Sequence, residues 1–201
     1  MQGIGFQASV SVSLIAAVAA SGQIIDFEVA PPPTAGFNGF RTTSYSEDGF
    51  TLQGEFTDGL TISASTDTNG FAGSRGLYSQ FQNQTITLTK DDGGNFDILS
   101  VDLAEINTSS PAFTIAISEF RGFRDGVEVA SVTFAPLNDG STFATYVFPS
   151  TFINLGAVEF GAVFGGNGYQ LDNITLGPPT PAPAAALVLA GGALASSRRR
   201  R

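Results

Sequence analysis

Residues 113–134 read FTIAISEFRGFRDGVEVASVTF, two runs of alternating apolar and polar residues joined by Asp125-Gly126. Alternation with a period of two is typical of strands that bury one face. Asp and Gly both tolerate positive φ, which the two central residues of a type I′ turn require. We therefore expect a β-hairpin with strands at residues 113–124 and 127–134.

The same alternation recurs over most of the chain between residues 23 and 177. Turn-forming Gly, Asn and Asp separate the runs, and we expect residues 91–95 (DDGGN) to form a hairpin turn rather than a calcium loop. We find no convincing helix and no internal repeat. The sequence predicts an all-β domain at residues 23–177, an antiparallel β-sandwich of jelly-roll type whose core the 18 Phe residues supply. Further strands are expected at residues 25–29, 60–64, 85–89, 96–103, 143–148, 157–164 and 169–176.

A short hydrophobic segment precedes this domain. Residues 9–20 are an apolar run ending in small residues, which fits a secretory signal peptide spanning residues 1–22. No Lys or Arg precedes Arg41, although signal peptides usually begin with positive charge. We therefore expect export, with either an atypical signal or a start upstream of Met1.

The C-terminal residues 178–201 combine a Pro/Ala motif, a short apolar run at residues 184–195 and four arginines. A spanning helix needs about 20 apolar residues, and cytoplasmic flanks are rich in Lys and Arg. The order of parts predicts a short transmembrane segment held at the membrane, with a plain tail anchor as the alternative. The motif and the cluster consist of Pro181, Ala182, Pro183, Ala184, Arg198, Arg199, Arg200 and Arg201.

This tail resembles the PEP-CTERM class of bacterial sorting signals. Because Ala182 stands where that class has Glu, the tail is more similar to the Glu-less Val-Pro-Leu-Pro-Ala variant. The resemblance implies an exosortase-type membrane protease as partner, and export from a Gram-negative bacterium to the cell surface or extracellular space after transient anchoring in the inner membrane.

Composition excludes several functions. All 18 acidic residues but only five of the nine basic residues lie in the body, which leaves it at −13 and repels nucleic acid. The chain has no His and no Cys, so catalytic triads, thiol nucleophiles and most zinc sites are absent. Glycoside hydrolysis by paired carboxylates is the remaining catalytic class, with Asp102 and Glu105 as the nearest pair. The pair resembles part of the laminarinase-type pattern Glu-x-Asp-x-x-Glu, but Ser100 occupies the position of its first Glu. We therefore expect a non-enzyme.

The ends of the body, IDFE at residues 25–28 and YQLDNI at residues 169–174, are similar to those of jelly-roll carbohydrate-binding modules. The resemblance implies that the first and last strands pair and that acidic residues on them hold a structural Ca²⁺. Asp26 and Glu28 would share one strand face, and a bulge near Asp172 would turn its carboxylate toward them. The alternative is that these three acids face water.

The function that these observations favour is an exported, non-enzymatic surface or matrix protein associated with exopolysaccharide. The alternative is a lectin-like carbohydrate-binding module with structural calcium, and a glycoside hydrolase is the weakest candidate. For sugar binding, the sequence offers aromatic and cationic side chains, each of which could equally cap the core or pair with a neighbouring acid. They are Tyr45, Tyr78, Tyr146, Tyr169, Arg41, Arg75, Arg121 and Arg124.

Processing of the tail can be tested on the mature protein isolated from its host. We expect mass spectrometry to find peptides of residues 23–177 and no peptide containing the arginine block at residues 198–201, because the protease would remove it. Recovery of that block on the mature protein would contradict processing.

Overall fold

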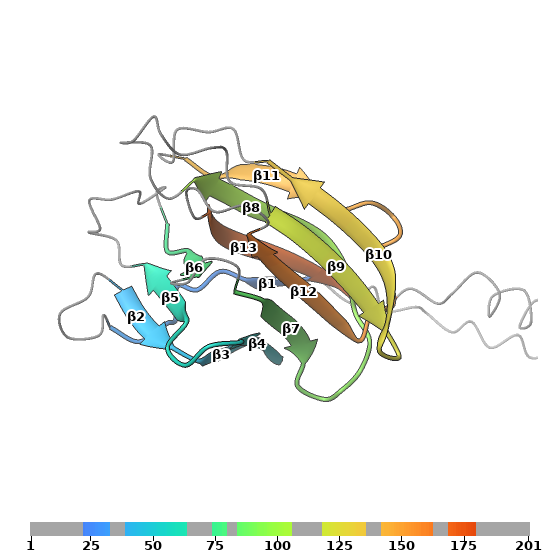
Figure 1. The fold of residues 1–201 in the computed structure, drawn as a ribbon, viewed down its shortest axis with the longest axis horizontal. Coiled ribbons are helices and arrows are strands. Elements are labelled where there is room, and N and C mark those ends of the chain that lie inside the picture. Colours follow the sequence, from blue (N-terminus) through green and yellow to red (C-terminus); the bar gives the residue numbers. More distant parts are fainter. Residues whose placement is uncertain are drawn as a thin grey trace, which may run out of the picture.

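The computed structural model describes residues 22–32, 39–63, 74–79, 84–105, 118–135, 142–162 and 169–179. These residues form two antiparallel sheets that face each other, which confirms the predicted β-sandwich (Figure 1). The predicted signal peptide, the sorting tail from residue 180 onward and the strand start at residues 113–117 lie outside the described residues. Within the described residues, no helix is long and apolar enough to cross a membrane.

The first sheet has seven strands. Its order is β11-β8-β13-β6-β5-β2, and β1 also pairs with β13. Their bounds are β1 Gln23–Ile25, β2 Gly39–Thr42, β5 Leu60–Ser63, β6 Leu77–Ser79, β8 Asp97–Glu105, β11 Ala144–Val147 and β13 Tyr169–Gly177.

The second sheet has six strands in the order β10-β9-β12-β7-β4-β3. Their bounds are β3 Ser44–Glu47, β4 Phe50–Gly54, β7 Ile86–Lys90, β9 Ser118–Arg124, β10 Val127–Phe134 and β12 Ala157–Ala162.

Alternation along the strands produces the core, as the sequence predicts. Phe120 on β9 is 1% exposed, and its ring lies 5.1 Å from Phe148 and 5.2 Å from Phe160. Edge-to-face and stacked contacts of this kind stabilise a core beyond the area they bury. The aromatic cluster therefore joins the two sheets where β9, β12 and the end of β11 meet.

The predicted hairpin at Asp125-Gly126 is confirmed. The φ angles of these residues are 52° and 76°, as a type I′ turn needs, and β9 pairs with β10 around them. A second turn of this kind, Asp48-Gly49 with φ angles of 50° and 79°, joins β3 to β4.

Residues 91–95 form a turn, but the prediction of a hairpin is wrong. They connect β7 of the six-stranded sheet to β8 of the seven-stranded sheet, so the strands they join pair with other partners. Inside the turn, the Gly94 amide donates to Asp92 Oδ1 at 2.8 Å, and Lys90 Nζ lies 2.9 Å from Asp92 Oδ2. The turn therefore carries the chain across the end of the sandwich.

Candidate functional site

The predicted bulge near Asp172 is present, and the first and last strands pair. On one edge, β13 pairs first with β6 at residues 170–171 and then with β1 at residues 174–176. Its register against β8 shifts between Asp172 and Thr175, and Asn173 has a φ of 47°. The bulge therefore lies where β13 changes neighbours.

Asp172 is buried at this bulge. It is 1% exposed and accepts hydrogen bonds from Ser74 Oγ and, at 2.7 Å, from the Asn173 amide. Asn173 Nδ2 also donates to Asp102 Oδ2 at 2.9 Å, so this amide bridges two acids that are opposite each other on β13 and β8. These bonds supply the partners that a buried carboxylate requires.

The expectation that Asp26 and Glu28 share a strand face is wrong. β1 ends at Ile25, and Phe27 takes a φ of 60° while the Glu28 amide donates to Asp26 Oδ1 at 3.1 Å. Glu28 Oε1 accepts from the Arg75 amide at 3.1 Å, and Asp26 instead neighbours Glu47. The three predicted ligands are therefore divided between two places.

Across the described ranges, no group of three or more His, Cys, Asp or Glu side chains is placed to hold a metal ion. Glu28 still lies close enough to influence Asp172 electrostatically. Calcium binding by Asp26, Glu28 and Asp172 stays a prediction.

Electrostatics at the two places differ in their causes. Burial raises the pKa of Asp172 to about 6, and the charges of Asp102 and Glu28 add to this, while the hydrogen bonds from Ser74 and Asn173 oppose it. Burial also raises the pKa of Glu47, with Asp26 acting in the same direction. In each place one carboxyl group therefore binds a proton more readily than a free side chain does.

Most tyrosines proposed for sugar binding serve the fold instead. Tyr45 and Tyr169 are 6% and 4% exposed, and the Tyr45 hydroxyl donates to Glu47 Oε2 at 2.8 Å. The Tyr146 hydroxyl donates to the Ala135 carbonyl at 3.2 Å. These residues therefore offer little free aromatic surface to a ligand.

The arginines proposed for the same role are also engaged. Arg75 Nη1 donates to the Ala30 carbonyl at 2.6 Å, and Arg124 donates to the carbonyls of Ile153 and Asn154 at 2.9 and 3.0 Å. Arg121 pairs with Glu159 at 2.7 Å rather than with Glu119 or Asp125. Arg121 also lies over the ring of Phe123.

The carboxylates considered for hydrolysis lie on β8. Asp102 Oδ1 accepts from Thr145 Oγ1 at 2.6 Å, and its other oxygen accepts from Asn173. Glu105 is the last residue of β8, as expected for a strand end. Asp102 is thus occupied by hydrogen bonds that tie β8 to β11 and β13.

The outer face of the six-stranded sheet carries a polar surface. Because Phe120 and Phe160 point inward, their neighbours Arg121, Phe123 and Glu159 point outward. The strand register places Arg121 and Glu159 in line with a polar residue from each of the other four strands of this sheet. One row across it consists of Ser44, Gln53, Thr87, Glu159, Arg121 and Ser131.

Phe123 is an aromatic residue on this face. The guanidinium carbon of Arg121 lies 5.7 Å from the centre of the Phe123 ring, and the ion pair with Glu159 holds the guanidinium there. The side chains of Arg121 and Glu159 remain 39% and 31% exposed. The guanidinium therefore covers one side of a half-buried ring.

A hollow of about 480 Å³ adjoins the ring. Glycines at three of its positions keep it open, while an amide and two carboxylates supply polar groups on its rim. Its lining is Gly93, Asn95, Phe123, Asp125, Gly126, Gly156, Ala157 and Glu159. We call these residues together with Arg121 the Phe123 site.

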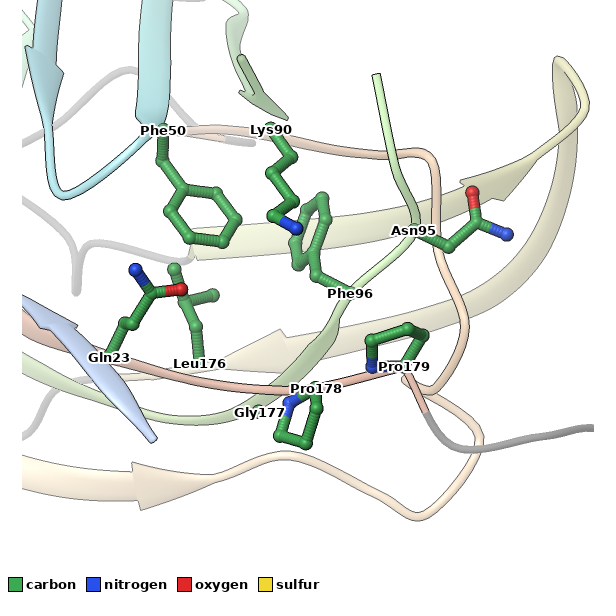
Figure 2. Close-up of a pocket in the computed structure, with 9 residues that line it drawn as sticks. All are labelled: Gln23, Phe50, Lys90, Asn95, Phe96, Leu176, Gly177, Pro178 and Pro179. Carbon is green, nitrogen blue, oxygen red and sulfur yellow. The ribbon is translucent and has the colours of Figure 1, made fainter. Parts of the chain in front are cut away.

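A second, smaller pocket of about 160 Å³ lies at the end of the sandwich (Figure 2). Lys90 extends between the rings of Phe50 and Phe96, which form its floor with Leu176, and all three apolar residues are 1% exposed. The lysine stem therefore covers apolar surface while its ammonium group reaches Asp92. At this pocket Lys90 covers the core, and the Phe123 site is the better candidate for a ligand.

Phe123, Asn95 and Glu159 were not singled out as ligand residues from the sequence. One signal was available for Phe123: it stands out of phase with Phe120, so the alternation that buries Phe120 points Phe123 to the outer face, where it is half-buried. Asn95 had no such signal, because only the crossing of residues 91–95 between the sheets brings it to the hollow.

Comparisons with known proteins give likenesses of architecture. No protein-family model matches the chain, and no curated protein does. A mutant family 29 carbohydrate binding module is 14% identical over 79% of this chain and 91% of its own, with a TM-score of 0.44. A mutant of such a module complexed with mannohexaose is 15% identical over 80% and 92%, with a TM-score of 0.43. An arabinose-bound α-L-arabinofuranosidase, MgGH51, is 14% identical over 72% and 26%, with a TM-score of 0.41. Likenesses of this size identify no ligand for this chain.

The raised pKa of Asp172 predicts a pH dependence of stability. Because the folded state holds this proton up to about pH 6 and the unfolded chain releases it near 3.8, stability rises as the pH falls from 7.5 to 5. We expect a gain of about 1 kcal/mol after allowance for solvent screening. Asp172→Asn should remove this part of the dependence, measured by urea unfolding at both pH values. Equal slopes for the two proteins would contradict the assignment.

The calcium prediction is tested by the melting temperature with EDTA and with added Ca²⁺. A bound ion stabilises the folded state, so Ca²⁺ should raise the melting temperature and Asp172→Asn should abolish that rise. An unchanged melting temperature in all conditions would rule out a structural ion at these residues.

Proposed function

We propose that this protein is a non-catalytic carbohydrate-binding domain that acts at the Phe123 site. One observation carries the proposal: the ring of Phe123 lies on an open sheet face between the Arg121–Glu159 ion pair and a hollow of about 480 Å³. The ligand of this site is a neutral polysaccharide.

The chemistry of the site suits a sugar ring. The C–H face of a pyranose is apolar and packs against an aromatic ring, while its equatorial hydroxyl groups need donors and acceptors in the plane around it. Arg121 can donate to a hydroxyl group, and Glu159 and Asp125 can accept from one. Charged partners strengthen such hydrogen bonds.

Charge argues for a neutral glycan. The lining of the hollow includes the carboxylates of Asp125 and Glu159, Arg121 pairs with Glu159, and Glu128 lies opposite Phe123 on the adjacent strand. The chain as a whole has a net charge of −9. A polysaccharide rich in carboxylate or sulfate groups would be repelled, whereas a neutral one would not.

Binding fits these residues better than hydrolysis does. Glycosidases need one carboxyl group that gives a proton and a second one at a defined distance. Glu159 is instead held in an ion pair, and Asp102 is held by Thr145 and Asn173 on the other sheet. Glu159 and Asp102 thus have fixed partners on neighbouring strands.

Delivery to the cell exterior is part of the proposal. The sorting tail, Pro181 to Ala184 with the arginines 198–201, would direct an exported protein to an exosortase-type protease and leave the domain at the cell surface. There it would contact exopolysaccharide through the Phe123 site. The resemblance of the tail to PEP-CTERM signals supports this step.

Binding can be tested by isothermal titration against a panel of neutral and acidic oligosaccharides. We expect a neutral oligosaccharide to bind and Phe123→Ala to weaken it roughly tenfold, because the loss of one aromatic contact is worth about 1 kcal/mol or more. Phe56→Ala is the matched control, since Phe56 is a phenylalanine 43% exposed on the turn after β4.

Two results would overturn the proposal. One is an absence of binding to every member of the panel. The other is an equal loss of affinity in Phe123→Ala and Phe56→Ala, which would place binding elsewhere.

A further inference from the structure

Strand β10 forms one edge of the six-stranded sheet. Among the described strands it pairs only with β9, so its other side faces outward (Figure 1). An edge strand presents backbone N–H and C=O groups that can pair with another strand. At eight residues, β10 is twice the length of β3, the four-residue strand at the opposite edge of the same sheet.

The usual protections of an edge are sparse here. β10 reads VEVASVTF, with Glu128 as its only charged residue and with no Lys or Pro. A bulge at Val129 interrupts its first part, because the register against β9 shifts between Glu128 and Ala130. The remaining residues 130–134 form a regular, uncharged edge.

Some of the exposed apolar side chains lie next to this edge, outside residues 130–134. Seven large apolar side chains are exposed among the described residues, and three of them lie on the edge strands β10 and β11: Val127, Val129 and Val147. The two strands adjoin, because the ring of Phe134 lies 5.1 Å from that of Tyr146. Exposed apolar surface beside an unpaired edge is typical of an interface.

We propose that β10 pairs antiparallel with β10 of a second copy of this chain. A twofold axis at Val132 places Ser131 opposite Thr133 of the second copy, a cross-strand pair that can form a hydrogen bond between hydroxyl groups. Glu128 then lies outside the paired residues 130–134. The chain has a net charge of −9, so two copies repel each other over most of their surface. No carboxylates face each other when they pair along residues 130–134.

The pairing joins two six-stranded sheets into one continuous sheet. Side chains alternate along β10, so Ser131 and Thr133 point to the outer face that also carries Arg121 and Phe123. Phe120 is opposite Val132, and Phe123 lies three residues further along β9. With about 4.8 Å between strands and about 3.4 Å per residue, the two Phe123 rings lie roughly 25 Å apart on one surface.

This arrangement makes the dimer bivalent, a consequence that rests on the proposed function. A polysaccharide held at one Phe123 site is within reach of the other, and the second contact is then intramolecular. Short oligosaccharides would occupy the sites independently.

The pairing is tested by sedimentation velocity on the full chain between 5 and 100 μM, values chosen to span typical homodimer affinities on the order of micromolar. We expect a species of twice the 20.8 kDa chain mass. Ser131→Lys/Thr133→Lys places two charges on the edge and should give a monomer. Ser44→Lys, on the exposed edge strand β3, is the matched control and should remain dimeric.

A monomeric parent protein would overturn the proposal, and so would a dimeric Ser131→Lys/Thr133→Lys variant. A cooperative melting transition shows that the double variant is folded. On immobilised polysaccharide, the double variant should dissociate at least tenfold faster than the parent. If no glycan binds, sedimentation alone still decides the pairing.

Discussion

The two neighbours of β13 on a single edge impose the main constraint on this fold. β6 pairs with the beginning of β13 and β1 with its end, so the chain of β13 must bend where one partner stops and the other starts. The bulge at Asn173 provides that bend, and it turns Asp172 into the gap between Ser74 and Asp102. The buried acid is thus a consequence of how the strands are connected. The hydrogen bonds of Asp172 replace the strand pairing that is interrupted where β13 changes partner.

Alternation has two outcomes on β9. Phe120 points inward and joins the aromatic contacts between the sheets, whereas Phe123 points outward beside Arg121. The rigid core therefore holds the open face in place. Because Glu159 lies on β12 and Arg121 on β9, their ion pair also fixes the relative position of two neighbouring strands. The same backbone pairing that stabilises the sheet orients the polar groups of the Phe123 site.

Sequence patterns predict the parts of this structure that depend on local chemistry. The alternating run at residues 127–134 is a strand with those bounds, and Asp125-Gly126 forms the expected turn. The out-of-phase residues Leu171 and Ile174 indicate the bulge, because both must be buried on one strand. Short strands such as β2, β3 and β6 escaped prediction, since three or four residues contain too few alternations to differ from a loop. β4 was missed despite its alternation. Residues 91–95 show the same limit, because turn chemistry specifies a reversal and not which sheet receives the next strand. Asn95, brought to the hollow by that crossing, was invisible for the same reason.

The pairing of Gln23 with Leu176 places the two ends of the domain next to each other. The segments on either side of the domain therefore leave from adjacent points, and tension applied between them acts across one short pair of antiparallel strands. Such a load breaks the hydrogen bonds between β1 and β13 one after another, beginning at Gln23, instead of shearing all of them at once. The core around Phe120 and the strands β9, β10 and β12 would carry none of that first load. Under mechanical strain, the outermost strand can thus peel away while the sheet that bears the Phe123 site keeps its shape.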